Sequence, residues 1–367
     1  MKLTCRAAEL NIGVQTIQSA LSSRTTLPIL LNFLMESCES KLRMVSTDLQ
    51  MGVTHHIPAE IEEEGSITIP ARKFSDILHT LPPDKDVFIS MGEENRVVVK
   101  CGRSRFTLNG TAKAEYPVLP EFNKKNAFEV KGGQLAEMVK KTIFAASSDE
   151  TRYVLNGVFW VGAGGSLEMV ATDGRRLASA KDSVLPKDRQ FRIIIPTKIL
   201  HELVRLLGDD SDVPVLVNVA ENQVGFHWGE TTMTSRLVEG NFPNYEQVIP
   251  SKKDIRVGFS TKDLLLITKQ AALCVPDRAG SVRCRFKSGA FQVSAADQTS
   301  EFEDELPIDY KGDDFVIAFN PHYLIDGLKC MGTDKVWIGL TTPVSPALIE
   351  PETENGYKYV VMPMRLS

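Results

Sequence analysis

The sequence predicts an α+β protein built from three copies of one unit of about 120 residues. Two recurring patterns predict this fold. In the first, an alternating strand ends in a small polar turn, and the aspartates of the three turns, Asp48, Asp173 and Asp297, are spaced 125 and 124 residues apart. In the second, a strand runs into an amphipathic helix about 22 residues after each aspartate.

Each unit is predicted to open with a strand, a helix and a second strand, within 1–37, 126–162 and 255–288. In the second unit, apolar residues recur at i, i+3, i+4, i+7 and i+8 from Leu135, which is the spacing of one helix face. Residues Leu10 to Leu21 follow a similar pattern in the first unit. These patterns predict one amphipathic helix near the start of every unit.

A second helix per unit is indicated by proline. Pro70 and Pro196 fall where the later helices begin, and Pro321 lies one residue further on. Proline is favoured there because the N–H that it lacks would be unpaired anyway. With roughly eight short strands per unit, we expect domains at 1–122, 126–250 and 254–367, separated by short polar linkers.

Composition excludes several classes of protein. Apolar residues make up 43% and charged residues 24%, which is typical of globular chains rather than disordered ones. The longest stretch without a charge is only 15 residues, and no apolar leader follows Met1, so we expect a cytoplasmic protein with no membrane partner. The six cysteines form no C-x-x-C pair, which favours reduced and mostly buried thiols and no metal or other cofactor.

The net charge of −5 does not indicate a strongly basic nucleic-acid binder, but its distribution is uneven. The six predicted helices together carry +3, and the rest of the chain carries −8. One interpretation is that these are ordinary solvated faces of amphipathic helices. The other is that the helices line one surface that meets phosphates, with contacts that do not depend on base sequence.

Several longer motifs resemble the bacterial DNA polymerase III beta subunit family, the sliding clamps. The motifs are Arg24-Thr-Thr-Leu-Pro-Ile-Leu, Ile69-Pro-Ala-Arg-Lys-Phe, Gly102-Arg-Ser-Arg-Phe, Arg152-Tyr-Val-Leu-Asn-Gly, Val170-Ala-Thr-Asp-Gly-Arg-Arg-Leu, Gly240-Asn-Phe-Pro-Asn-Tyr and Tyr359-Val-Val-Met-Pro-Met-Arg-Leu. Each motif is weak by itself, but together they span the chain in order and at the length of the family.

The resemblance implies a head-to-tail homodimeric ring of six DNA-clamp domains around double-stranded DNA, with helices lining the hole and sheets outside. It implies a processivity factor for DNA replication that performs no chemistry of its own. The implied partners are a second copy of the chain, DNA, the DNA polymerase III catalytic subunit, the clamp loader, and other polymerases and repair proteins that bind through a short apolar peptide. We therefore expect it on the nucleoid in bacterial cytoplasm.

For DNA contacts, the resemblance points to Arg24, Lys73, Tyr153 and Lys198. The chain departs from the familiar pattern beside this set. Val154 stands where a second aromatic residue is common, and Asp149 is acidic where a neutral residue is familiar.

For client proteins, the resemblance points to a cleft between the second and third units. Its residues here are Leu155, Thr172, Gly174, Arg175, Arg176, Leu177, Pro243, Val248, Val344, Val360, Met362, Pro363, Met364 and Arg365. Methionine and short aliphatic side chains make an adaptable surface. Arg175 replaces a frequent histidine, and Pro346 stands where a small polar residue is common. Without the resemblance, Met362 to Met364 would be read as ordinary packing near a terminus.

The two ends of the chain carry opposite charges that suit a head-to-tail dimer interface. The candidate interface residues are Arg96, Arg103, Arg105, Phe106 and Leu108 in the first unit, and Leu273, Glu301, Glu303, Asp304 and Glu305 in the third. The alternative is that each cluster is a charged edge strand that guards against aggregation.

Two other classes of function remain as rivals. An enzyme is disfavoured because Gly162-Ala-Gly-Gly165 lacks phosphate-loop spacing, no G-x-S-x-G occurs, and His55-His56 has no nearby ligand at metal-site spacing. We interpret the glycines as a hairpin turn and Thr172-Asp173-Gly174 as a turn shared by the repeat. The second rival is a triplicated scaffold that binds only proteins, and the basic helices favour DNA over it.

Overall fold

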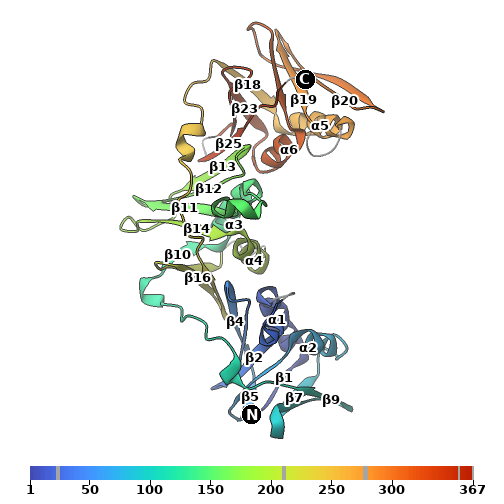
Figure 1. The fold of residues 1–367 in the computed structure, drawn as a ribbon, viewed down its shortest axis with the longest axis vertical. Coiled ribbons are helices and arrows are strands. Elements are labelled where there is room, and N and C mark those ends of the chain that lie inside the picture. Colours follow the sequence, from blue (N-terminus) through green and yellow to red (C-terminus); the bar gives the residue numbers. More distant parts are fainter. Residues whose placement is uncertain (22–24, 209–211, 276–279, 354–355, 366–367) are drawn as a thin grey trace. The chain divides into compact units, whose positions relative to one another are not determined.

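The computed structural model describes residues 1–21, 25–208, 212–275, 280–353 and 356–365. The chain forms two compact bodies (Figure 1). The N-terminal body comprises Met1–Gly133 and His201–Leu237, and the C-terminal body comprises Gln134–Leu200 and Val238–Ser367.

The three repeats contain the predicted series of elements, with two α-helices in each. The first repeat has α1 (Ala7–Ile17), α2 (Ala71–Leu78), β1 (Lys2–Arg6), β2 (Asn32–Cys38), β3 (Lys41–Thr47), β4 (Met51–Pro58), β5 (Glu60–Glu63), β6 (Ser66–Pro70), β7 (Asp86–Met91), β8 (Arg96–Cys101) and β9 (Ser104–Asn109). The second has α3 (Gly132–Thr142), α4 (Thr197–Leu207), β10 (Phe128–Lys131), β11 (Gly157–Ala163), β12 (Ser166–Thr172), β13 (Arg176–Asp182), β14 (Phe191–Pro196), β15 (Pro214–Val219), β16 (Gln223–Trp228) and β17 (Thr231–Arg236). The third has α5 (Thr261–Ala271), α6 (Pro321–Lys329), β18 (Ile255–Ser260), β19 (Val282–Lys287), β20 (Ala290–Ala296), β21 (Glu301–Pro307), β22 (Phe315–Phe319), β23 (Lys335–Leu340), β24 (Ala347–Pro351) and β25 (Tyr357–Val361).

Each body contains one long sheet that joins two repeats. In the N-terminal body the strand order is β10-β15-β16-β17-β4-β3-β2-β6, and β17 pairs with β4. In the C-terminal body the order is β14-β11-β12-β13-β25-β24-β23-β18, and β13 pairs with β25. The middle repeat is therefore shared between the bodies, because each of its two sheets continues into a neighbouring repeat. The exact domain boundaries at 122–126 and 250–254 stay predictions.

The other sheet of each body ends in a charged strand. In the N-terminal body the order β5-β1-β7-β8-β9 leaves β9 at an edge, and in the C-terminal body the order β21-β20-β19-β22 leaves β21 at an edge. An edge strand presents unpaired backbone N–H and C=O groups to whatever lies beside it.

The amphipathic helices bury the faces that periodicity predicts. Leu10, Val14 and Ile17 of α1 are buried, and Leu135 and Val139 of α3 are fully buried. Proline takes the expected first position in the helix of the third repeat, whereas Pro70 and Pro196 end the strands that directly precede α2 and α4. Pro321 is the first residue of α6, and the side chain of Asn320 caps that helix by accepting a hydrogen bond of 2.9 Å from the His322 N–H.

The aspartate turns of the three repeats have the same construction. The Oδ1 atoms of Asp48, Asp173 and Asp297 accept backbone N–H groups three residues later, at 2.8, 3.0 and 2.7 Å. Each carboxylate thus serves its own turn, which confirms the interpretation of Thr172-Asp173-Gly174 as a shared turn. The hairpin between β11 and β12 likewise has Gly164 and Gly165 at φ values of 58° and 89°, which a two-residue turn requires.

Within the described residues all six cysteines are free thiols, with Cys5, Cys101 and Cys284 buried and Cys38 exposed. Within those residues, no three His, Cys, Asp or Glu side chains gather into a possible metal site. The helices described there are all too short or too polar to cross a bilayer.

Candidate functional site

The candidate cleft lies in the C-terminal body where β13 meets β25. Leu177 of β13 pairs with Val360 of β25, which pairs in turn with Leu348 of β24. Residues in one row across a sheet point to the same face. All three belong to one buried apolar cluster that also contains Phe159 and Tyr245. The long sheet therefore brings residues from 159 to 360 together into a common apolar cluster.

Other expected cleft residues are apolar and exposed. Val344 is 82% exposed and Val248 is 40% exposed. Pro243 is also exposed, whereas Leu155 is buried. The expected cleft residues therefore include both buried and solvent-exposed apolar side chains.

The segment Met362 to Met364 is fixed beside the cleft by backbone hydrogen bonds. The Met362 N–H donates to the Arg175 carbonyl at 2.9 Å, and the Met364 N–H donates to the Ala318 carbonyl at 2.8 Å. The side chains of Met362, Pro363 and Met364 are half-buried, and Arg365 is exposed. Their polarizable surface is thus held at a defined place on the cleft wall.

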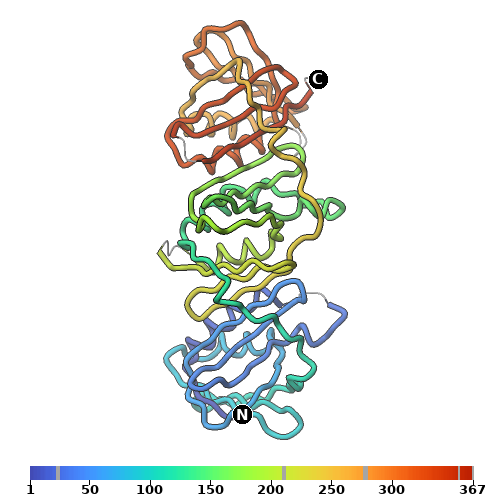
Figure 2. Tube along the Cα trace, turned by 90° about the vertical axis from the view of Figure 1, so that its left-hand side faces the viewer, coloured from blue at the N-terminus to red at the C-terminus, as the bar shows by residue number. Residues whose placement is uncertain are grey.

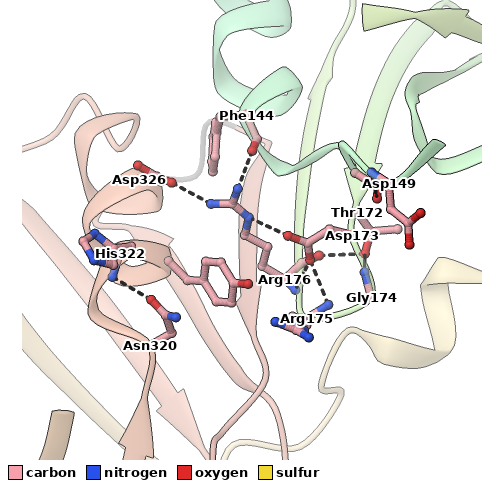
Figure 3. A network of polar contacts seen from close by, with 12 residues as sticks. Phe144, Asp149, Thr172, Asp173, Gly174, Arg175, Arg176, Asn320, His322 and Asp326 are labelled. Atoms are coloured by element: carbon pink, nitrogen blue, oxygen red, sulfur yellow. Dashed lines mark hydrogen bonds and ion pairs between the residues drawn. The ribbon is translucent and has the colours of Figure 1, made fainter. Parts of the chain in front are cut away.

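Arg176 forms the centre of a polar network next to this wall (Figure 3). Its Nε donates to Asp173 Oδ2 at 3.1 Å, its Nη1 to Asp326 Oδ2 at 2.6 Å, and its Nη2 to the Phe144 carbonyl at 2.6 Å. Its guanidinium also lies 4.7 Å from the Tyr323 ring centroid. Burial opposes the charge, but Tyr359, Asp326 and Asp173 outweigh it and raise the pKa of Arg176. The Arg176 side chain therefore links β13 to α6 and to the 3-10 helix Ile143–Ala145 that follows α3.

A polar pocket of about 470 Å³ opens onto this network. It is lined by Ala146, Ser147, Ser148, Asp149, Arg152, Asp173, Arg175, Arg176, His322, Tyr323 and Asp326. Arg175 and Arg176 were expected at the site, whereas Tyr323 and Asp326 were missed. One signal was available for Asp326. Asp76, Glu202 and Asp326 occupy the same position in the three later helices, so an acid recurs there in every repeat.

The expected DNA-contact residues are surface residues where they are described. Lys73 of α2 and Lys198 of α4 are exposed, and Tyr153 is 59% exposed in a short 3-10 helix, Glu150–Leu155. Arg24 lies outside the described residues. The Asp149 side chain caps that 3-10 helix, and hydrogen bonds from Thr151 lower its pKa.

The expected interface residues lie on the two charged edges. Arg96, Arg103 and Arg105 are exposed on or between β8 and β9, with Phe106 half-buried and Leu108 buried in its own body. On the other body, Glu301, Glu303, Asp304 and Glu305 are exposed along β21, and Leu273 after α5 is 80% exposed. The geometry leaves both groups of charge accessible on edge strands.

Comparisons with known proteins agree over the whole chain. Family models for the N-terminal, central and C-terminal domains of the DNA polymerase III beta subunit match residues 1–120, 129–244 and 246–365. The chain belongs to the DNA polymerase III beta subunit family. It is 34% identical to the beta sliding clamp of Pseudomonas aeruginosa over 100% of both chains, and 32% identical to that of Escherichia coli K12 over 100% of both.

Solved structures give the same result. The DNA polymerase III subunit beta of P. aeruginosa matches with a TM-score of 0.94 at 33% identity, and the sliding clamp of Bacillus subtilis with a TM-score of 0.96 at 29% identity, each covering 100% of both chains. The chain therefore has three DNA-clamp domains, and its function is that of a DNA sliding clamp and processivity factor. As a member of this family, the chain has DNA and a polymerase as partners.

Proposed function

We propose that two copies of the chain close head to tail into a ring around double-stranded DNA, and that each copy offers one cleft to client peptides. The observation that supports the cleft is the row Leu177–Val360–Leu348, which belongs to one apolar cluster with Phe159 and Tyr245. A ring holds DNA by topology, so no tight contact is needed and the protein is free to slide. The proposed role involves no catalysis, and we propose that the protein acts on the nucleoid in bacterial cytoplasm.

The proposed dimer pairs the basic edge around β9 with the acidic edge around β21 of a second copy. A contact between two different surfaces forms a ring when its rotation closes. Opposite charges guide the encounter, and exposed Leu273 with half-buried Phe106 supplies the apolar part. The buried side chain of Leu108 supports β9 from within its own body.

The proposed DNA contacts are Arg24, Lys73, Tyr153 and Lys198, acting on phosphates without reading bases. We expect the loaded protein to remain on closed circular DNA and to slide off linear DNA with free ends. Replacing Arg24, Lys73 and Lys198 by glutamine should weaken direct binding and reduce its log–log salt dependence by about one unit per lost phosphate contact. Equal retention on circular and linear DNA would contradict encirclement and favour a scaffold that binds only proteins.

The proposed clients are the DNA polymerase III catalytic subunit, the clamp loader, and other polymerases and repair proteins. Each would insert an extended peptide whose Leu and Phe anchors are buried in the cleft, at about 1.5–3 kcal/mol per anchor. The solved structure of the P. aeruginosa clamp bound to griselimycin is consistent with a ligand site on this family.

Calorimetry with a Gln-Leu-Ala-Leu-Phe peptide tests the cleft. Deleting Met362 to Leu366 removes one wall and should abolish most of the binding, while the dimer mass and retention on circular DNA stay near wild-type values. Val118→Ala, at a 95% exposed position in the other body, is the control and should bind normally. Undiminished binding by the truncated protein would place the client site elsewhere.

A further inference from the structure

The junction between β17 and β4 in the N-terminal body repeats the construction of the candidate cleft. Thr47 pairs with Gly52 there, as Thr172 pairs with Leu177 in the cleft, so Gly52 occupies the position of Leu177. Gly52 pairs with Thr234 of β17, and Thr234 pairs with Gly225 of β16. The row Gly52–Thr234–Gly225 therefore corresponds to the row Leu177–Val360–Leu348, with glycine in place of both leucines.

The chain itself fills the space above these two glycines. A Cβ added at Gly52 would lie 2.6 Å from Leu119 Cδ1, and one added at Gly225 would lie 2.8 Å from Phe122 Cδ2. The backbone conformation at Gly52 and Gly225 is one that any residue adopts, because neither has a positive φ. Glycine is needed there for space, so that two side chains can approach the sheet.

Leu119 and Phe122 sit on this row as two anchors of one extended segment. Leu119 packs against Leu34, Val45 and Tyr116. Leu34 and Val45 precede Phe159 and Val170 of the cleft by 125 residues, the spacing of the repeat. The Phe122 ring lies 5.5 Å from that of His227.

The proline content of the segment explains its shape. Pro117 and Pro120 disfavour a helix and favour a polyproline II conformation, whose repeat of three residues places Leu119 and Phe122 on one side. Val118, between the prolines, is 95% exposed and points away. The linking segment can be followed in teal in Figure 2.

We propose that the row Gly52–Thr234–Gly225 is a second peptide-binding site, occupied in cis by residues 119–122 of the same chain. The ligand that it fits is an extended peptide with an aliphatic anchor followed three residues later by an aromatic one. The interpretation of the row as a peptide site rests on the proposed client cleft, which has the same construction.

Occupation in cis keeps this row closed to free peptides. A tethered segment acts at an effective concentration on the order of millimolar. A free peptide of similar affinity at micromolar concentration cannot displace it, because the effective concentration of the tethered segment is about a thousandfold higher. A free peptide can therefore bind the row Gly52–Thr234–Gly225 only when the side chains of Leu119 and Phe122 are removed.

The test uses the variant Leu119→Ala/Phe122→Ala and a fluorescein-labelled peptide with the sequence of residues 117–122, Pro-Val-Leu-Pro-Glu-Phe. Anisotropy should show that the peptide binds the variant at least about tenfold more tightly than the wild type. The peptide should raise the melting temperature of the variant but not that of the wild type. If the double variant does not fold, Phe122→Ala is measured in the same way. Val118→Ala should behave as the wild type.

A third substitution separates the two sites. Gly225→Leu, added to the double variant, fills the space that Phe122 leaves and should abolish the gain in binding. The truncation of Met362 to Leu366 should leave the gain intact, even if the client cleft is lost or was wrongly placed. The proposal is overturned if the double variant binds no more peptide than the wild type, or if Gly225→Leu leaves the gain unchanged.

Discussion

Arg176 and Asp326 form an ion pair of 2.6 Å that joins the start of β13 to helix α6. The two residues are 150 positions apart in the sequence and come from different repeats. The arginine side chain is only 12% exposed, whereas that of Asp326 is 37% exposed. Burial has removed water from the Arg176 charge, so loss of the Asp326 acceptor would leave that desolvation cost uncompensated. The ion pair therefore favours the arrangement in which β13 and α6 lie together.

Asp326→Ala removes the acceptor and should lower the free energy of unfolding by about 1–3 kcal/mol, the usual cost of leaving a buried donor without its hydrogen-bond partner. Glu202→Ala is the matched control. It removes the equivalent acid in the second repeat, whose partner Arg205 is 45% exposed, and should cost less than about 1 kcal/mol. Chemical denaturation measures both variants. Equal losses would show that Arg176 is no more dependent on its partner than a surface arginine.

The backbone conformation of the aspartate turns predicts that two substitutions change the stability of the protein in opposite directions. Leu49 and Gly174 hold the same place in their turns, at φ values of 74° and 84°. The left-handed conformation costs an L-residue about 1–2 kcal/mol, and glycine avoids that cost. Leu49→Gly should thus stabilise the protein by about 1 kcal/mol, and Gly174→Ala should destabilise it by a similar amount.

Thermal unfolding checks both turn variants. An added Cβ at Gly174 would meet only the end of the flexible Arg152 side chain, at 3.3 Å, so the expected loss is conformational rather than steric. Gly92→Ala is the control, because its φ is −101° and an added Cβ would meet nothing nearer than 3.8 Å. If Leu49→Gly destabilises the protein, side-chain packing of Leu49 outweighs its backbone strain.

Local features were predictable from the sequence because their causes are local. Helix faces follow from apolar spacing such as that of Leu135 and Val139, and the aspartate turns follow from a recurring motif. The junctions were not predictable from periodicity, since the pairing of Leu177 with Val360 depends on strands far apart in the chain. The resemblance supplied the cleft residues, but it did not supply Asp326, which acts through Arg176.

Two histidines in the N-terminal body predict a loss of stability in mild acid. Burial lowers the pKa of His55, with a further contribution from His56, and Glu230 opposes both. Burial also lowers the pKa of His227, with Lys124 and His56 acting in the same direction and Glu230 and a Thr231 hydrogen bond opposing. The unfolded chain therefore binds protons more readily than the folded one as the pH falls through about 6.5. The contribution of these two histidines to the free energy of unfolding is fully present above that pH and declines as the pH falls below it.

Denaturation at several pH values between about 7.5 and 5.5 measures this slope. His55→Gln and His227→Gln should each flatten it, because glutamine does not titrate. The same change at exposed His201 should leave the slope as it is in the wild type. A slope that the first two variants do not alter would assign the acid sensitivity to other groups.

The proposed head-to-tail dimer predicts a charge reversal that a second reversal rescues. Arg103→Glu/Arg105→Glu makes both edges acidic, so this variant should dimerise at least about tenfold more weakly than the wild type. The loss should be larger at low salt, where charges are screened least. Glu301→Lys/Glu303→Lys makes both edges basic and should fail in the same way. Lys181→Glu/Lys187→Glu, at exposed positions in the middle repeat, is the control and should dimerise normally.

Mixing the two interface variants should restore a dimer, since one interface then has the natural charges and the other has them exchanged. Sedimentation of the separate and mixed proteins measures this rescue. If β9 met β9 and β21 met β21 instead, the wild type would place like charges at both contacts, and the mixture would dimerise more tightly than the wild type. The head-to-tail contact predicts that the mixture only recovers the wild-type affinity. A wild-type protein that is monomeric at micromolar concentration, or a mixture that stays monomeric, would refute the proposed ring contact.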